Sequence, residues 1–343
     1  MPCGPLFFDS PCLTSQSCHF YSPFSSRSLL NTQQIQLASL PRPTMHTHSS
    51  RYHGVLFTCM VITLSMPFLV SGARPPAPVQ RRQANLGYSI PMDGSGSMLT
   101  QAQDTYPPGL GEPINVIISA NSDSAVLQNT VNNGGLINYY QSFNFSTECL
   151  GQHSGDNQGA NLGDGNGYRM HVLLECHLFC LRVSVLVNQT AVIRWDYGNV
   201  QLGTCEETLE GGDHIRYWIQ NGADANSGAI FMALSYEMPI AAQHNIIVNG
   251  YNLGRDWMIG NATTQSSIIP TSKLTNSSTY SGSTSFNGYT YHTTVNYVSG
   301  LLQNSSVGIN HFQTVAVNDT SAIDGLVAVM TVKITTRRGH IDP

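Results

Sequence analysis

The chain has 343 residues, of which 10% are charged and 41% are hydrophobic, so it holds enough apolar side chains for a sizeable core. From Gln83 to the end there are nine Lys or Arg and nineteen Asp or Glu, which gives a net charge of −10. Because a nucleic-acid-binding protein needs a basic surface to neutralise phosphates, this charge balance excludes that class.

A secretory signal peptide is predicted at residues 45–73. It starts with a short basic region, MHTHSSRYH, continues with the apolar run GVLFTCMVITLSMPFLV, and ends in small residues before RPPAPVQRRQ. The alternative is a transmembrane anchor, but such a helix needs about 20 apolar residues and this run is shorter and contains Ser and Pro. We therefore expect a secreted, extracellular protein with no membrane anchor.

The segments on either side of the signal peptide are not expected to form domains. Residues 1–44 contain three cysteines without a pattern, and Asp9 is their only acid, so we interpret them as a gene-model extension before a start at Met45. Residues 74–111 are rich in Pro, Gly, Ser and Gln and are expected to be a propeptide and linker. Within them, Arg81-Arg82 is either a dibasic processing site or a solvated pair.

The core is predicted to be a single α+β domain at residues 112–262, with a glycosylated, β-rich continuation at 263–343. The helical spacing of 124–143 is interrupted at Gly134-Gly135, and a second, short helix is expected at 252–261. Strands are expected at 114–119, 190–197, 214–220, 228–237 and 324–335. Two or three helices packed against a mainly antiparallel sheet define the α+β class.

Asn-x-Ser/Thr sequons are frequent in the part of the chain after the signal peptide. Behind a signal peptide they predict an N-glycosylated protein. The sequon positions are Asn144, Asn188, Asn261, Asn276, Asn304 and Asn318.

An apolar segment at residues 169–187 interrupts a polar loop and contains Cys176 and Cys180. If it is removed, the loop runs directly into the next strand, so one hypothesis is a retained intron; the alternative is a genuine buried strand or helix. Four cysteines allow three pairings, and without this segment Cys149 pairs with Cys205. No zinc site is expected, because the partners of a Cys-x3-Cys pair are missing.

The side chains most able to carry chemistry gather in GGDHIRYWIQNG and HNIIVNGYNLGRDW. They are Asp213, His214, Arg216, His244, Arg255 and Asp256. Side chains two apart on a strand share a face, and His with Arg can bind an anion or perform acid–base chemistry near neutral pH. The alternative is structural: a satisfied strand His, and an Arg–Asp pair that anchors a helix to the sheet.

The order of INVIIS, H-x-R-x-W, an apolar strand ending in an acid, and the Arg255-Asp256 pair resembles the LssY carboxy-terminal domain family over residues 113–262. Where that family has His-His-x-Arg, this sequence has Asp213 before His214, so the first His is absent. The chain also resembles uncharacterised secreted proteins of mushroom-forming fungi. These resemblances imply a domain and no particular reaction.

The sequence lacks the motifs of several well-known metal, hydrolase and nucleotide sites. DGNGYRMHVLLE has no EF-hand ligand at position five and no Gly at six, and no G-x-S-x-G, P-loop or dinucleotide fingerprint occurs. No metal or cofactor is therefore expected.

We expect a protein that binds an extracellular ligand or glycan or has a structural role. The alternative is an extracellular hydrolase acting on a phosphate or glycan substrate at His214, Arg216, His244 and Arg255.

Overall fold

The computed structural model describes residues 86–153, 157–169, 183–184, 186–265, 271–316 and 319–337. All of these residues belong to one compact unit, Ala73–Pro343. Several predicted features lie outside the described residues. They are the 1–44 extension, the signal peptide, Arg81-Arg82, Cys176 and Cys180 with most of the apolar segment, and Asn318.

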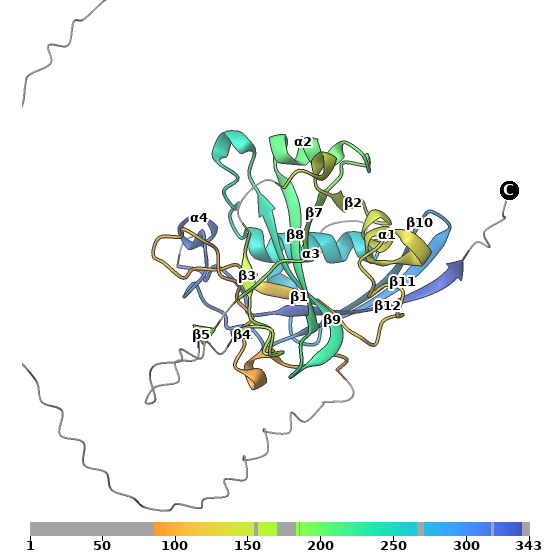
Figure 1. Cartoon of the computed structure of the whole chain (residues 1–343). Helices are drawn as coiled ribbons and strands as arrows, with labels where there is room; N and C mark the ends of the chain where they lie inside the picture. The colour runs from red at the N-terminus through yellow and green to blue at the C-terminus, as the bar shows by residue number, and fades with distance from the viewer. Residues whose placement is uncertain are drawn as a thin grey trace, which may run out of the picture. The chain divides into compact units, whose positions relative to one another are not determined.

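An eight-stranded sheet, curled into a half-barrel, organises the domain (Figure 1). The strand order is β10-β11-β12-β1-β9-β8-β7-β2. The strands are β1 (Ile114–Ile118), β2 (Phe145–Thr147), β7 (Ala191–Trp195), β8 (Gly212–Asn221), β9 (Asn226–Glu237), β10 (Thr279–Phe286), β11 (Tyr289–Val298) and β12 (Val327–Arg337).

Neighbouring strands of this sheet are antiparallel with one exception. Strands β1 and β12 run parallel, with Val116 opposite Ala328. The sheet is therefore mixed and mostly antiparallel. This confirms the predicted α+β class with a mainly antiparallel sheet. The same parallel pair places β10, β11 and β12 in one sheet with the strands of residues 112–262.

Two short strand pairs lie beside the main sheet. Strand β3 (Gly159–Ala160) pairs with β6 (Val187–Asn188), and β4 (Tyr168–Arg169) pairs with β5 (Val183–Ser184). These pairs contain both ends of the apolar segment 169–187.

The helices are short. They are α1 (Leu136–Gln141), α2 (Gly203–Glu210), α3 (Gly250–Ala262) and α4 (Phe312–Val315), with 3-10 turns η1 (Pro91–Gly94), η2 (Asn132–Gly134), η3 (Cys149–Gly151), η4 (Ile240–Ala242) and η5 (Thr271–Lys273). The helix expected at 252–261 is confirmed as α3. The helical prediction for 124–143 is wrong before Leu136, because that stretch forms turns and Asn133 takes a left-handed φ of 56°.

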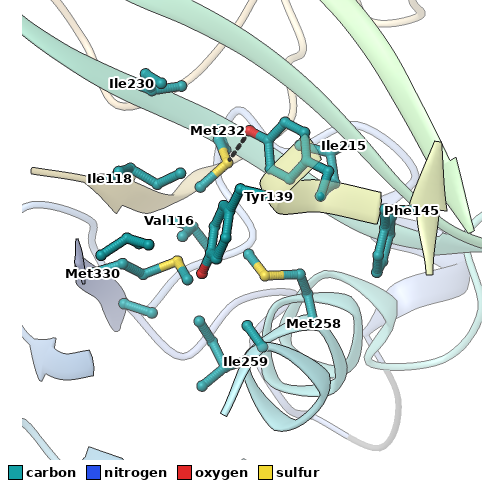
Figure 2. Close-up of a cluster of buried hydrophobic side chains, with 14 of the residues drawn as sticks. Val116, Ile118, Tyr139, Phe145, Ile215, Ile230, Met232, Met258, Ile259 and Met330 are labelled. Carbon is teal, nitrogen blue, oxygen red and sulfur yellow. Dashed lines mark hydrogen bonds between the residues drawn. The ribbon is translucent and has the colours of Figure 1, made fainter. Parts of the chain in front are cut away.

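Both faces of the central strands β1, β8 and β9 are buried, as the alternation along β8 shows. Ile215 and Tyr217 belong to one apolar cluster, and Trp218 belongs to the other. Figure 2 shows side chains of the sheet, α1 and α3 meeting in the first cluster, among them Tyr139 and Met258. The second cluster is covered by the segments before β1 and before β12.

The linker predicted at 74–111 is wrong for residues 86–111. Met98 and Tyr88 are buried in the second cluster, and Ile114 donates its amide to the Met98 carbonyl at 2.8 Å. The segment is rich in Gly and Pro because it follows the sheet surface closely: a Cβ at Gly111 would lie 1.7 Å from the Thr100 carbonyl oxygen.

Cys149 and Cys205 form a disulfide, with their Cα atoms 4.9 Å apart. The bond joins η3 to α2 across a sequence separation of 56. The described residues contain no helix long and apolar enough to cross a lipid bilayer.

Candidate functional site

The predicted chemical side chains do not meet in one site. His214 and His244 contact a cluster centred on Arg194, whereas Arg255 and Asp256 form a separate network at the start of β12. Arg216 has its Nε 3.9 Å from Oε2 of the buried Glu112.

Arg194 holds three carboxylates together. Its Nη1 donates to Glu207 at 2.9 Å and to Glu237 at 3.2 Å, and its Nε lies 3.6 Å from Glu148. Arg194 of β7 is directly opposite His214 of β8, so both side chains lie on the same face of the sheet. Glu237 reaches them from the end of β9, and Glu207 from α2.

Three histidines contact these carboxylates. His214 Nδ1 lies 3.3 Å from Glu237 Oε1, and His244 Nδ1 lies 3.4 Å from Glu237 Oε2. On the other side, His153 Nδ1 lies 2.7 Å from Glu148 Oε2. His214 is completely buried, while the side chains of His244 and His153 are 23% and 33% exposed.

Burial and charge set the protonation of this cluster. Burial lowers the pKa of His214 to about 4, so this ring is neutral at pH 7. Burial also raises the pKa of Glu207 to about 7, although Arg194 opposes the shift. Burial works against ionisation of Glu237 as well, but His214, His244 and Arg194 hold its pKa below the ordinary value. The contact with Glu237 in turn raises the pKa of His244.

Asp213 lies beside this cluster as a buried acid. Neither of its carboxyl oxygens has a hydrogen-bond partner among the described residues, and burial raises its pKa well above the ordinary value. Helix α3 passes close to it at Gly254, where an added Cβ would lie 2.7 Å from Asp213 Oδ1. Burial thus favours the protonated form of this acid, and Gly254 lets the helix approach it closely.

Arg255 and Asp256 anchor α3, as the structural alternative predicts. The Arg255 guanidinium donates to both oxygens of Asp256, at 2.7 and 3.0 Å, and to both oxygens of Asp324, each at 2.8 Å. It also donates to the Leu326 carbonyl at 2.7 Å, and Tyr297 donates its hydroxyl to Asp256 at 2.8 Å. Arg255 and Asp256 are completely buried, while the side chain of Asp324 is 24% exposed.

Two cavities among the described residues lie elsewhere. A cavity of about 200 Å³ is lined by Ala160, Leu162, Asp164, Asn166, Val187, Thr190, Trp218, Ile219 and Asn221. A second, of about 290 Å³, is mostly apolar and lies between the 92–99 and 301–309 segments. Neither is lined by a predicted catalytic residue.

Sequence reasoning missed the residues that organise the cluster, namely Arg194, Glu207 and Glu237. A weak signal existed: Arg194 interrupts the apolar strand TAVIRWDY, and Glu237 ends the apolar strand GAIFMALSYE. A charged residue inside or at the end of a buried strand needs a partner. The sequence does not say which partner it has.

The sequons differ in accessibility. Asn144, Asn188, Asn276 and Asn304 are exposed. Asn261 is different, because its Nδ2 is buried in α3 and has no hydrogen-bond partner among the described residues. Because an N-linked glycan is attached through Nδ2, we expect less modification at Asn261 than at the four exposed sequons.

Comparison with known proteins finds no family, no curated protein and no solved structure that matches the chain. Within the described ranges, no group of three or more His, Cys, Asp or Glu side chains is placed to hold a metal ion.

Proposed function

We propose that this chain is a secreted, N-glycosylated extracellular protein that acts by binding or in a structural role, and not as a catalyst. One observation carries the proposal: the buried candidates His214 and Arg255 are paired with carboxylates of the protein itself. His214 contacts Glu237, and Arg255 contacts Asp256 and Asp324. A catalytic acid or base must reach a substrate atom within hydrogen-bond distance, and these groups face the interior.

Secretion is part of the same proposal. Four exposed sequons and the Cys149–Cys205 disulfide are features that a protein in an oxidising extracellular compartment would have. The signal-peptide pattern at 45–73 supports the same localisation.

A substrate screen of the purified secreted protein tests the proposal against the hydrolase alternative. Phosphate esters and glycosides would be offered to the wild type and to His244→Ala, because His244 is the most accessible of the predicted residues. We expect no turnover above the buffer rate for either protein. Turnover by the wild type that His244→Ala abolishes would establish the hydrolase instead.

A further inference from the structure

The outer face of β10, β11 and β12 is an ordered surface of hydroxyl side chains. On β10, Thr284 points inward, where its hydroxyl lies 2.6 Å from that of Ser142 at the end of α1. Residues of the opposite parity therefore point outward, away from α1 and α3. The same alternation on β11 buries Tyr291 and Tyr297 and leaves Thr294 exposed.

Strand pairing aligns these side chains in rows across the three strands. The rows are Ser281–Thr294–Thr331, Ser283–His292–Lys333 and Ser285–Thr290–Thr336, and Thr279 and Asn296 extend them. We name these residues the hydroxyl face. Neighbouring strands are about 4.8 Å apart, and outward residues on one strand repeat about every 6.7 Å, so the hydroxyls form a regular grid.

Strand propensity does not account for this composition. Thr is common in strands, but Ser is not among the residues enriched there, and β10 has it at positions 281, 283 and 285. Exposed edge strands are usually protected by charge, above all by Lys. Within the rows, the hydroxyl face has one Lys and no acid.

Local contacts order part of the face. Ser285 donates to the Thr290 hydroxyl at 2.9 Å, and the Ser283 hydroxyl lies 3.0 Å from Nδ1 of His292. Lys333 is paired with Asp123 at 3.3 Å, which compensates its charge. Each hydroxyl can both donate and accept, so the Thr290 hydroxyl hydrogen is still available to a ligand.

We propose that the hydroxyl face is the docking surface for a neutral polysaccharide; this inference rests on the proposed function as an extracellular binding protein. Charge complementarity identifies the partner. A polyanion requires a basic surface, which is absent here, whereas an uncharged polymer of hydroxyl groups matches a nearly uncharged grid of hydroxyls. A regular grid also suits a repeating polymer, because many weak contacts add along its length.

Depletion assays on insoluble polymers test the proposal. The secreted protein would be mixed with chitin, cellulose and β-1,3-glucan particles, and with pectate as an anionic polymer. The variant Ser283→Glu/Thr294→Glu places two acids in the centre of the face, while Thr294→Ser keeps the hydroxyl. The matched control is Ser272→Glu, at an exposed position of η5 outside the rows.

We expect the wild type, Thr294→Ser and Ser272→Glu to be depleted by at least one neutral polymer, and the double variant to bind at least tenfold more weakly with an unchanged Tm. No depletion by any neutral polymer, binding to pectate alone, or equal binding of the folded double variant would overturn the proposal. If the wild type and the folded double variant bind equally and neither turns over a substrate, the proposed function as a binding protein still holds. Only the assignment of binding to the hydroxyl face is then rejected. If the double variant misfolds, Thr294→Asn and Ser283→Asn are measured singly.

Discussion

Arg194 of β7 and Glu207 of α2 form an ion pair of 2.9 Å in which both side chains are almost completely buried. The pair fixes α2 on the sheet beside the Cys149–Cys205 disulfide, and it neutralises charge that would otherwise be stranded in the interior. The charged side chains of the candidate site are thus paired with one another inside the protein. Replacing them is expected to change mainly the free energy of unfolding.

Replacing Arg194 should destabilise the fold strongly. Arg194→Met leaves Glu207, Glu237 and Glu148 facing one another without their shared cation, and breaking a buried pair costs about 3–5 kcal/mol. Urea unfolding measures the loss. Lys333→Met is the control, because the exposed Lys333–Asp123 pair should contribute about 0–1 kcal/mol. Similar losses for both variants would contradict the role of Arg194.

His214 should make the fold sensitive to acid. Its pKa is lowered by burial from 6.5 to about 4 in the folded protein, so its contribution to stability is complete above pH 6.5 and is lost as the pH falls toward 4. Glu207 acts in the opposite sense, because its raised pKa removes stability as the pH rises from 4.5 to about 7.

The contributions of His214 and Glu207 can be separated by comparing the wild type with a His214 variant. The free energy of unfolding of the wild type minus that of His214→Gln should fall between pH 6.5 and 4 with a slope of up to about 1.4 kcal/mol per pH unit. A flat difference would show that His214 carries a proton in the folded state.

Gly254→Ala tests the close approach of α3 to Asp213. In an open helix position this change would stabilise by about 0.5–1 kcal/mol. Here the added Cβ would lie 2.7 Å from Asp213 Oδ1 and 2.8 Å from the Ser235 carbonyl carbon, so we expect a loss of about 1–3 kcal/mol instead. The sign of the change in Tm decides between the two.

Glycan occupancy should follow exposure. In protein secreted after expression from Met45, Asn276→Gln should remove one glycan and increase mobility on a gel, whereas Asn261→Gln should leave mobility unchanged, because Asn261 Nδ2 is buried. Glycopeptide mass spectrometry provides the count. A glycan on Asn261, or a protein retained in the cell, would contradict this reading.

Peptide mapping of the natural secreted protein tests the disulfide and the apolar segment together. Under non-reducing conditions we expect a fragment joining Cys149 to Cys205 and no peptide containing HVLLECHLFC. Loss of this bond in Cys149→Ser/Cys205→Ser should cost roughly 3–4 kcal/mol by loop-closure entropy. Recovery of the apolar peptide would reject the retained-intron hypothesis.

The sequence alone determined the local elements. Alternating or β-branched runs located β1, β7, β8, β9 and β12, and the spacing of 252–261 located α3, because side-chain periodicity reflects which face is buried. It did not locate β10, whose Ser-rich strand has no apolar stripe, or α2. It also misread residues 86–111, because Gly and Pro are common both in linkers and in segments that follow a sheet surface closely.

Tertiary structure alone decided which of the chemical side chains meet. Arg194 and Glu237 are 43 positions apart, and Arg255 and Asp324 are 69 positions apart, so no local pattern could pair them. The parallel joining of β1 to β12 decided that the hydroxyl-bearing strands extend the same sheet. These cases share one physical reason. A buried charge or an unpaired strand needs hydrogen-bond partners, and the packing of distant segments decides which groups come close enough to provide them.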